Sequence, residues 1–404
     1  MTTRSSAQNS TSSAWTRSRP RRPWTFRLNS REPFRSPRTG ERVMLTASRL
    51  VLARKRRRMT LSSLANKSGI SVRSLTAFEN GHKAPAPETM ETLAEALGLP
   101  LAFFAAPDVE EIELDAVSFR ALSKMSALDR DSARGAGRIV VEINDWIERS
   151  FGLPEPDVPT LPHLSPEDAA DRVRALWGLG EAPIPNMVHL LESHGVRVFS
   201  LAADCASVDA FSFRWKRTRP FIVLNLEKSG ERGRFDAAHE LGHLVLHSEH
   251  RIPHGQEAEQ EAQQFASAFL MPRSGLLAQR LYSADARRIL SAKLKWQVAA
   301  VALTYRLKDL GLITEWNYRT TVKQLSQMGF RRSEPGGIPR ESSQLLSKVF
   351  ATLRTQKIPV SRMAEEINLT VEELNLHVFG LVPTVVDGGG EMTSPAARPN
   401  LRAV

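Results

Sequence analysis

Residues 234–247 read RFDAAHELGHLVLH, and the two histidines of this stretch, His239 and His243, lie four positions apart. The residue pattern predicts a helix over the whole stretch. Four residues turn an α-helix through about 400°, so the two imidazoles lie about 40° apart on one face. This is the spacing of two ligands of a tetrahedral zinc ion. Glu240 lies beside them, where a carboxylate can take a proton from zinc-bound water and pass it to a leaving amine.

A catalytic zinc ion usually has three protein ligands and a water molecule, so a third ligand is needed. The next predicted helix, at about 256–270, carries two candidates, Glu259 and Glu261. His247 follows His239 by eight residues, which places its ring about 12 Å away on a face rotated by about 80°. We therefore expect His247 to support the site rather than to bind the same ion.

The segments around this motif predict an α+β domain in a chain that is otherwise mainly α. Three short stretches rich in β-branched and aromatic residues, at 196–201, 210–215 and 221–226, have the composition of strands. Helices are expected before and after them. We expect a domain with a small sheet over 165–320 and a helical C-terminal region with a loose tail over 321–404. A connector with several prolines, 105–164, precedes the domain.

Residues 44–104 predict a compact all-α bundle in which a tight turn joins two helices. Thr60 precedes the first helix, Gly69 provides the turn, where a left-handed conformation costs glycine little, and Ser71 caps the second helix. The pattern resembles the Cro/C1-type (Xre) helix-turn-helix over about sixty residues. The residues that carry the match are Thr60, Leu64, Ala65, Gly69, Ser71, Glu79, Gly81, Pro85, Leu93, Ala94, Leu97 and Gly98.

This resemblance implies a recognition helix at 71–77 that enters the major groove of double-stranded DNA. Arg73 is the best candidate for reading a base, because a guanidinium donates two hydrogen bonds to guanine. Leu61 departs from the family, which usually has a polar residue there that touches the DNA backbone. The side chains expected to face the groove are Ser71, Val72, Arg73, Ser74, Thr76 and Ala77. The candidates for phosphate contacts are Lys55, Arg56, Arg57, Arg58, Asn80 and Lys83.

The net charge of +11 is concentrated at the N-terminal end. Residues 1–43 hold ten arginines against two glutamates, and residues 44–104 hold nine lysines and arginines against four glutamates. Nucleic acid is the partner that such a basic end fits. Residues 1–43 contain few aliphatic side chains, so we expect either a disordered basic tail that adds phosphate contacts or a true start at Met44.

The metal motif and its surroundings resemble the ImmA/IrrE metallopeptidases, in the long form that fuses an Xre domain to the peptidase. The matching segments lie within about residues 50–380. They are 117–120, 177–179, 186–188, 235–243, 246–247, 259–266, 270–272, 303, 305–307 and 316.

The resemblance also implies the third ligand. In this family, and in related glutamate zincins, the ligand Glu lies four residues before an Asn or Asp that supports the site. Glu259 with Gln263 fits this spacing, with Gln in place of Asn or Asp, so we prefer Glu259 and keep Glu261 second. The family is found in bacteria and their mobile elements. It implies a zincin-like fold and a zinc-dependent endopeptidase that hydrolyses a specific protein such as a repressor.

Two functions follow from these motifs. The first is a bacterial transcriptional regulator that binds DNA through 44–104 and cleaves a protein. The alternative is a helix-turn-helix repressor or antitoxin whose zincin fold is a non-catalytic sensing or interaction module. Glu240 favours the first, because a scaffold has no use for it. A structural zinc site is the weakest interpretation, since such sites favour four ligands that include cysteine, and Cys205 is the one cysteine.

The composition also indicates the cellular compartment in which the protein is expected. A lone cysteine excludes an internal disulfide and fits a reducing environment. The chain lacks an apolar run of about eighteen residues and an apolar secretion segment, so no membrane span or export signal is expected. We expect a cytoplasmic protein with double-stranded DNA and a protein substrate as partners. A homodimer would read an operator with two half-sites.

Overall fold

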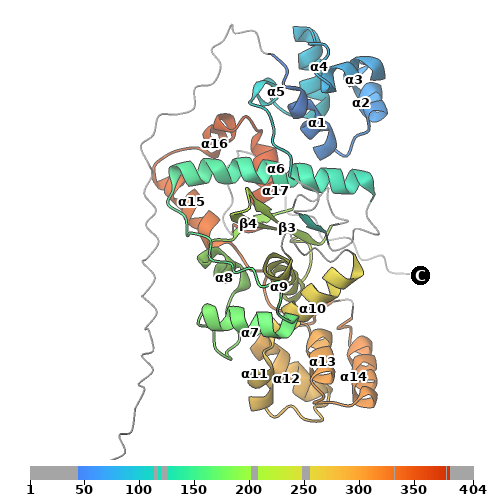
Figure 1. The fold of residues 1–404 in the computed structure, drawn as a ribbon, viewed down its shortest axis with the longest axis vertical. Helices are drawn as coiled ribbons and strands as arrows, with labels where there is room; N and C mark the ends of the chain where they lie inside the picture. The colour runs from blue at the N-terminus through green and yellow to red at the C-terminus, as the bar shows by residue number, and fades with distance from the viewer. Residues whose placement is uncertain are drawn as a thin grey trace, which may run out of the picture.

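The computed structural model describes residues 44–112, 117–119, 126–201, 208–247, 255–331, 333–378 and 380–382. The predicted tail at 1–43 and Cys205 lie outside these residues. The described chain is mainly helical with a small sheet, which confirms the expected fold class. In this part of the chain no helix has the length and apolar character needed to cross a membrane. Figure 1 shows three tiers along the long axis, with the sheet in the middle tier.

The N-terminal tier is a bundle of five short helices. Thr60 caps α2 by accepting a hydrogen bond from Ser63 N–H, and Ser71 caps α3 through Ser74 N–H. Gly69 between them has a φ of 72°, a left-handed conformation that favours glycine. These contacts build the predicted helix-turn-helix. The helices are α1 (Ala47–Arg56), α2 (Leu61–Ser68), α3 (Val72–Glu79), α4 (Pro87–Leu97) and α5 (Leu101–Ala105).

The middle tier contains a four-stranded sheet in the order β1-β3-β4-β2. Strand β3 runs antiparallel to both β1 and β4, whereas β2 runs parallel to β4. Successive side chains of β3 alternate between the two faces of the sheet, so Phe211 and Phe213 point one way and Ser212 points the other. The strands are β1 (Val117–Phe119), β2 (Arg197–Ser200), β3 (Ala210–Trp215) and β4 (Arg219–Leu224).

Twelve more helices complete the described structure. They are α6 (Ala127–Ser150), α7 (Pro166–Leu176), α8 (Met187–Ser193), α9 (Gly230–Leu246), α10 (Gln256–Leu270), α11 (Arg273–Ala278), α12 (Ala286–Trp296), α13 (Ala300–Asp309), α14 (Glu315–Gln327), α15 (Gln344–Thr355), α16 (Val360–Glu366) and α17 (Val371–Val378). Helices α11 to α14 form the tier at the far end from the N-terminal bundle (Figure 1).

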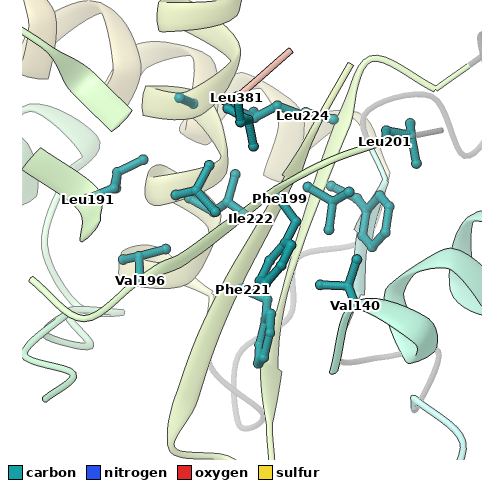
Figure 2. Close-up of a cluster of buried hydrophobic side chains, with 14 of the residues drawn as sticks. Val140, Leu191, Val196, Phe199, Leu201, Phe221, Ile222, Leu224 and Leu381 are labelled. Atoms are coloured by element: carbon teal, nitrogen blue, oxygen red, sulfur yellow. The ribbon is translucent and has the colours of Figure 1, made fainter. Parts of the chain in front are cut away.

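Helices cover the sheet and bury its apolar side chains. The long helix α6 crosses the aromatic face of β3, where a Cβ on Gly137 would meet the ring of Phe211 at 3.2 Å. Helix α9 packs against β3 and β4, and α8 packs against β2. Figure 2 shows Ile222 of β4 between Val140 of α6 and Leu191 of α8. The core of the body therefore forms around the sheet, and α9 is held against it.

The predicted connector at 105–164 is a structural part of the body, which corrects its expected role. It supplies β1 to the sheet and the whole of α6, which begins at a capping box formed by Ser126 and Asp129. The C-terminal region also returns to the sheet, because α17 packs against β2 and α6. Residues 105–164 join the body for two reasons. The backbone of β3 has an open edge with which β1 pairs, and the apolar side chains on one face of the sheet are covered by α6.

Candidate functional site

Helix α9 carries the HELGH motif and begins at Ser229, which caps the helix by accepting a hydrogen bond from Arg232 N–H. His239, Glu240 and His243 are all buried, and Glu240 is 0% exposed. The helix ends at Leu246, one residue before the predicted end, so that His247 has an extended backbone at the C-terminal cap. The motif thus lies within a buried helix that packs against the sheet and α10.

The close approach of α10 to α9 depends on Gly242. A Cβ at this position would meet the ring of Phe265 at 3.0 Å and the backbone of Ala262 at 3.2 Å. A glycine in the middle of a helix costs roughly 0.5–1 kcal/mol relative to alanine, so it is expected where another helix must approach closely. The absence of a side chain at Gly242 therefore lets α10 pack closely against α9 next to His243.

This crossing brings Glu259 to the histidine pair. Glu259 Oε2 lies 3.4 Å from His239 Nε2, and Glu259 Oε1 lies 3.4 Å from His243 Nε2. The two Nε2 atoms are 3.1 Å apart. One potential ligand atom from each residue lies within 4.8 Å of the others, and this is the only such group of His, Cys, Asp or Glu among the described residues.

Electrostatics keep Glu259 charged at this position. Burial alone would raise the pKa of its carboxyl, but hydrogen bonds with His239 and His243 outweigh burial and lower the pKa to about 2. An ionised carboxylate and two imidazoles are a donor set that can hold a divalent metal. The arrangement thus provides three converging ligand atoms of the type and charge that a metal needs.

Glu261, the second candidate for the third ligand, contacts His247 instead of the pair. Glu261 Oε2 lies 3.0 Å from His247 Nε2, and His247 Nδ1 lies 2.8 Å from His243 Nδ1. Burial, and then the neighbouring His243, lower the pKa of His247. Glu261 and His247 thus form a series of polar contacts that ends at the Nδ1 atom of His243. Gln263 is exposed on α10, so it is not placed to orient the histidines as the sequence suggested.

Ser212, a residue of the sheet that the sequence did not point to, holds the carboxylate of Glu240. Ser212 Oγ donates a hydrogen bond to Glu240 Oε2 at 2.7 Å, and both residues are buried. Ser212 interrupts the aromatic pattern of β3, AFSFRW, at an inward position. A small hydroxyl residue at such a position is the one sequence signal that could have indicated a polar partner on the helix below.

The recognition helix α3 presents its predicted groove-facing side to solvent. Ser71, Arg73 and Thr76 are exposed, and Val72 is 42% exposed although it is apolar. Ser74 and Ala77 are half-buried, whereas Leu75 and Phe78 on the opposite side belong to the core. Lys83 is exposed just after α3. Helix α3 lies farther from α6 than α1 does (Figure 1).

One predicted phosphate contact, Arg56, is instead buried inside the protein, and a second, Arg57, is only 22% exposed and pairs with the same acidic side chain as Arg56, which corrects their expected role. Arg56 is 0% exposed, and its Nε lies 2.8 Å from Glu373 Oε1. Arg57 Nη1 lies 2.6 Å from the other oxygen of Glu373. Arg58 is half-exposed and pairs with Asp129 at 2.5 Å. The cause is that the C-terminal end of α1 packs on α6 and α17, a contact between segments far apart in the sequence.

Two segments of the chain match known protein families. Residues 191–308 match the IrrE N-terminal-like domain, a peptidase family, and residues 50–104 match a helix-turn-helix family. No curated protein matches the chain. The first match contains the histidine pair and Glu259, and the second contains α3. These findings confirm the predicted resemblance and the order of the two domains: a DNA-binding type of unit precedes a metallopeptidase type of domain.

Proposed function

We propose that this chain is a bacterial transcriptional regulator that binds double-stranded DNA through α3 and hydrolyses a peptide bond in a specific protein, such as a repressor. His239, His243 and Glu259 would hold the zinc ion that this hydrolysis requires. The convergence of these three groups, with Glu240 beside them, carries the proposal. A DNA-binding regulator acts where the chromosome is, so we place the protein in the cytoplasm.

The three residues fit zinc in geometry as well as in chemistry. Ligand atoms about 2 Å from a tetrahedral ion lie about 3.3 Å from one another. The separations here are 3.1 Å between the imidazole nitrogens and 3.4 Å from each nitrogen to the carboxylate. Two imidazoles and one carboxylate are also the ligand set of many catalytic zinc sites, which leave a fourth position for water.

Glu240 is the proposed catalytic base. Bound zinc would polarise the scissile carbonyl and make water easier to deprotonate. The carboxylate of Glu240 would take the proton of the attacking water and deliver it to the leaving amine nitrogen. Ser212 fixes the direction of that carboxylate through its hydrogen bond to Oε2. His247 and Glu261 hold the ring of His243 in one orientation, as partners behind a metal ligand commonly do.

The DNA-binding role rests on the exposed side of α3. Arg73 is exposed there and pairs with no acidic side chain among the described residues, so its guanidinium is available to a guanine. Ser71, Ser74, Thr76 and Lys83 surround it and offer contacts to bases or phosphates. If the protein dimerises, each α3 would read one half-site of an operator.

A comparison of cells tests the peptidase. Glu240→Gln removes the base but keeps the shape and the ligands, and Glu227→Gln changes an exposed residue as a control. Under inducing conditions, new protein N-termini found in wild-type and Glu227→Gln cells should be missing in Glu240→Gln cells, where the uncleaved partner accumulates. An identical set of N-termini in all three strains would support the non-catalytic module instead.

A further inference from the structure

A pocket lies where the DNA-binding unit meets the body. It holds about 390 Å³ of empty space, counting its open mouth. One wall comes from Ser48, Leu52 and Lys55 of α1, and another comes from α6, against which α1 packs (Figure 1). The remaining wall comes from residues that follow α5, between 109 and 112. A molecule bound in this pocket would therefore touch both parts of the protein.

Arg138 of α6 lines this pocket with a guanidinium that is only partly bonded. Its Nη2 lies 3.3 Å from Glu142 Oε1, and its side chain is 12% exposed. Its other two nitrogens, Nε and Nη1, are buried and have no hydrogen-bond acceptor among the described residues. Burial lowers the pKa of Arg138, and the nearby carboxylates, Glu142 first, offset this only in part. Since buried donors in proteins are nearly always bonded, an anion is the type of ligand that this wall favours.

Two further cations line the pocket and share one exposed carboxylate. Lys55 Nζ lies 3.5 Å from Glu111 Oε1, and Arg134 Nη2 lies 3.2 Å from Glu111 Oε2. The side chain of Glu111 is 60% exposed, and such ion pairs contribute little to stability. A carboxylate from a ligand can therefore take the place of Glu111 at little cost. Asp131 is the only other acid of the lining, so the three cations outnumber the acids.

The rest of the lining is aliphatic and comes from Leu52, Val109 and Ile112. Pockets for small molecules combine apolar walls with a few polar groups that fix the orientation of the ligand. Guanidinium groups bind carboxylates through strong, charge-assisted hydrogen bonds. We propose that this pocket binds a small organic carboxylate, whose charge pairs with Arg134 and Arg138 and whose apolar group packs against the aliphatic wall.

A ligand in this pocket would hold α1 and α6 in one arrangement. Helix α3 packs on α1, so the direction of α3 relative to the body would be held as well. A ligand that favours one arrangement changes the affinity for an operator that the arrangements bind unequally, and this coupling is reciprocal. The inference goes beyond the proposed function, because it adds a signal that controls DNA binding and uses no residue of the histidine site.

Calorimetric titration of the full zinc-loaded chain tests the site, with benzoate and 4-methylpentanoate as probes and their uncharged amides as controls. One carboxylate should bind per chain, and its amide should bind about tenfold or more weakly, because the charge-assisted hydrogen bonds are lost. Arg134→Met should weaken the carboxylate to the same extent. Arg130→Met, one turn earlier on α6 and outside the pocket lining, should bind like wild type. No saturable binding of either carboxylate, or equal binding by the two variants, would overturn the inference.

A second variant and a second readout guard against a purely structural effect of Arg134, which also donates a hydrogen bond to Ile112 O at 2.6 Å. Val109→Trp fills the pocket from the opposite wall without removing a charge, so it should abolish carboxylate binding while unfolding like wild type without ligand. The bound carboxylate should change operator affinity by about fivefold or more in wild type and Arg130→Met, but not in Val109→Trp. Unchanged operator affinity in all three proteins would overturn the coupling. None of these measurements depends on peptide cleavage, so they test the pocket independently of the peptidase.

Discussion

Arg56 and Glu373 form a buried ion pair between the first described helix of the chain and the last one. The guanidinium Nε lies 2.8 Å from the carboxylate Oε1, and the two side chains are 0% and 1% exposed. Arg57 binds the second oxygen of Glu373, and His377 lies 3.3 Å from the first. Ser132 of α6 also donates a hydrogen bond to Arg56 O. The DNA-binding unit is thus anchored to the helices that cover the sheet.

Glu373→Gln should loosen this anchor. Removal of one partner of a buried ion pair typically costs about 3–5 kcal/mol, because the other charge stays buried without compensation. Glu372→Gln is the control, since Glu372 is exposed on the same helix and should change stability by less than about 0.5 kcal/mol. Urea unfolding measures both. A loss for Glu373→Gln no greater than for Glu372→Gln would show that the pair does not hold the two parts together.

The same pair predicts a dependence on pH. Burial alone would raise the pKa of Glu373, but His377 and the two arginines outweigh burial and hold the pKa far below its ordinary value of 4.5. A carboxyl whose pKa is lower in the folded state stabilises the protein above the unfolded-state pKa, and this contribution is lost as the pH falls below it. The wild type should therefore lose stability below about pH 4.5 more steeply than Glu373→Gln.

Gly242→Ala should separate α9 from α10. The added methyl group would meet Phe265 and Ala262, and overpacking of this kind costs about 1–3 kcal/mol. Since α10 carries Glu259, zinc affinity should fall as well. Gly233→Ala on the same helix meets nothing within 4 Å and should be neutral or stabilising by up to about 1 kcal/mol. Unchanged zinc affinity in Gly242→Ala would mean that this contact does not position the third ligand.

The two carboxylates of α10 should differ in their effects on the metal. Glu261→Gln removes the charged partner of His247, and loss of a group behind a ligand typically lowers metal affinity about 10–100-fold. Glu259→Ala removes a ligand and should lower the affinity further. Competition with a fluorescent zinc chelator gives both constants. The reverse order would show that Glu261, not Glu259, is the third ligand.

Arg73→Ala should weaken binding to a selected operator by about 1–3 kcal/mol, with little effect on unrelated DNA, because it removes a base contact. Lys83→Ala is the matched comparison, since loss of a phosphate contact weakens binding to all sequences and reduces the salt slope by about 1. Fluorescence anisotropy on an operator selected from random duplexes measures these changes. Equal weakening by Arg73→Ala on every duplex would make Arg73 a phosphate contact.

Features that depend on neighbouring residues, such as helix faces and caps, could be predicted from the sequence. Contacts between segments far apart in the chain could not. The helical period alone placed His239 and His243 on one face, and the caps at Thr60 and Ser71 defined the turn. The choice between Glu259 and Glu261 depends on the angle at which α10 crosses α9, which local spacing does not encode. The pairing of Arg56 with Glu373 joins residues 317 positions apart, so the basic run at 55–58 had the pattern of a DNA-binding surface.

The zinc content of the purified full chain, measured by mass spectrometry of the metal, tests the metal site most directly. Wild type and Glu240→Gln should each hold about one zinc per chain, because Glu240 binds no metal in this arrangement. A variant with both His239→Ala and His243→Ala should hold none, since one carboxylate cannot retain the ion. One zinc per chain in that double variant would contradict the assignment of the site.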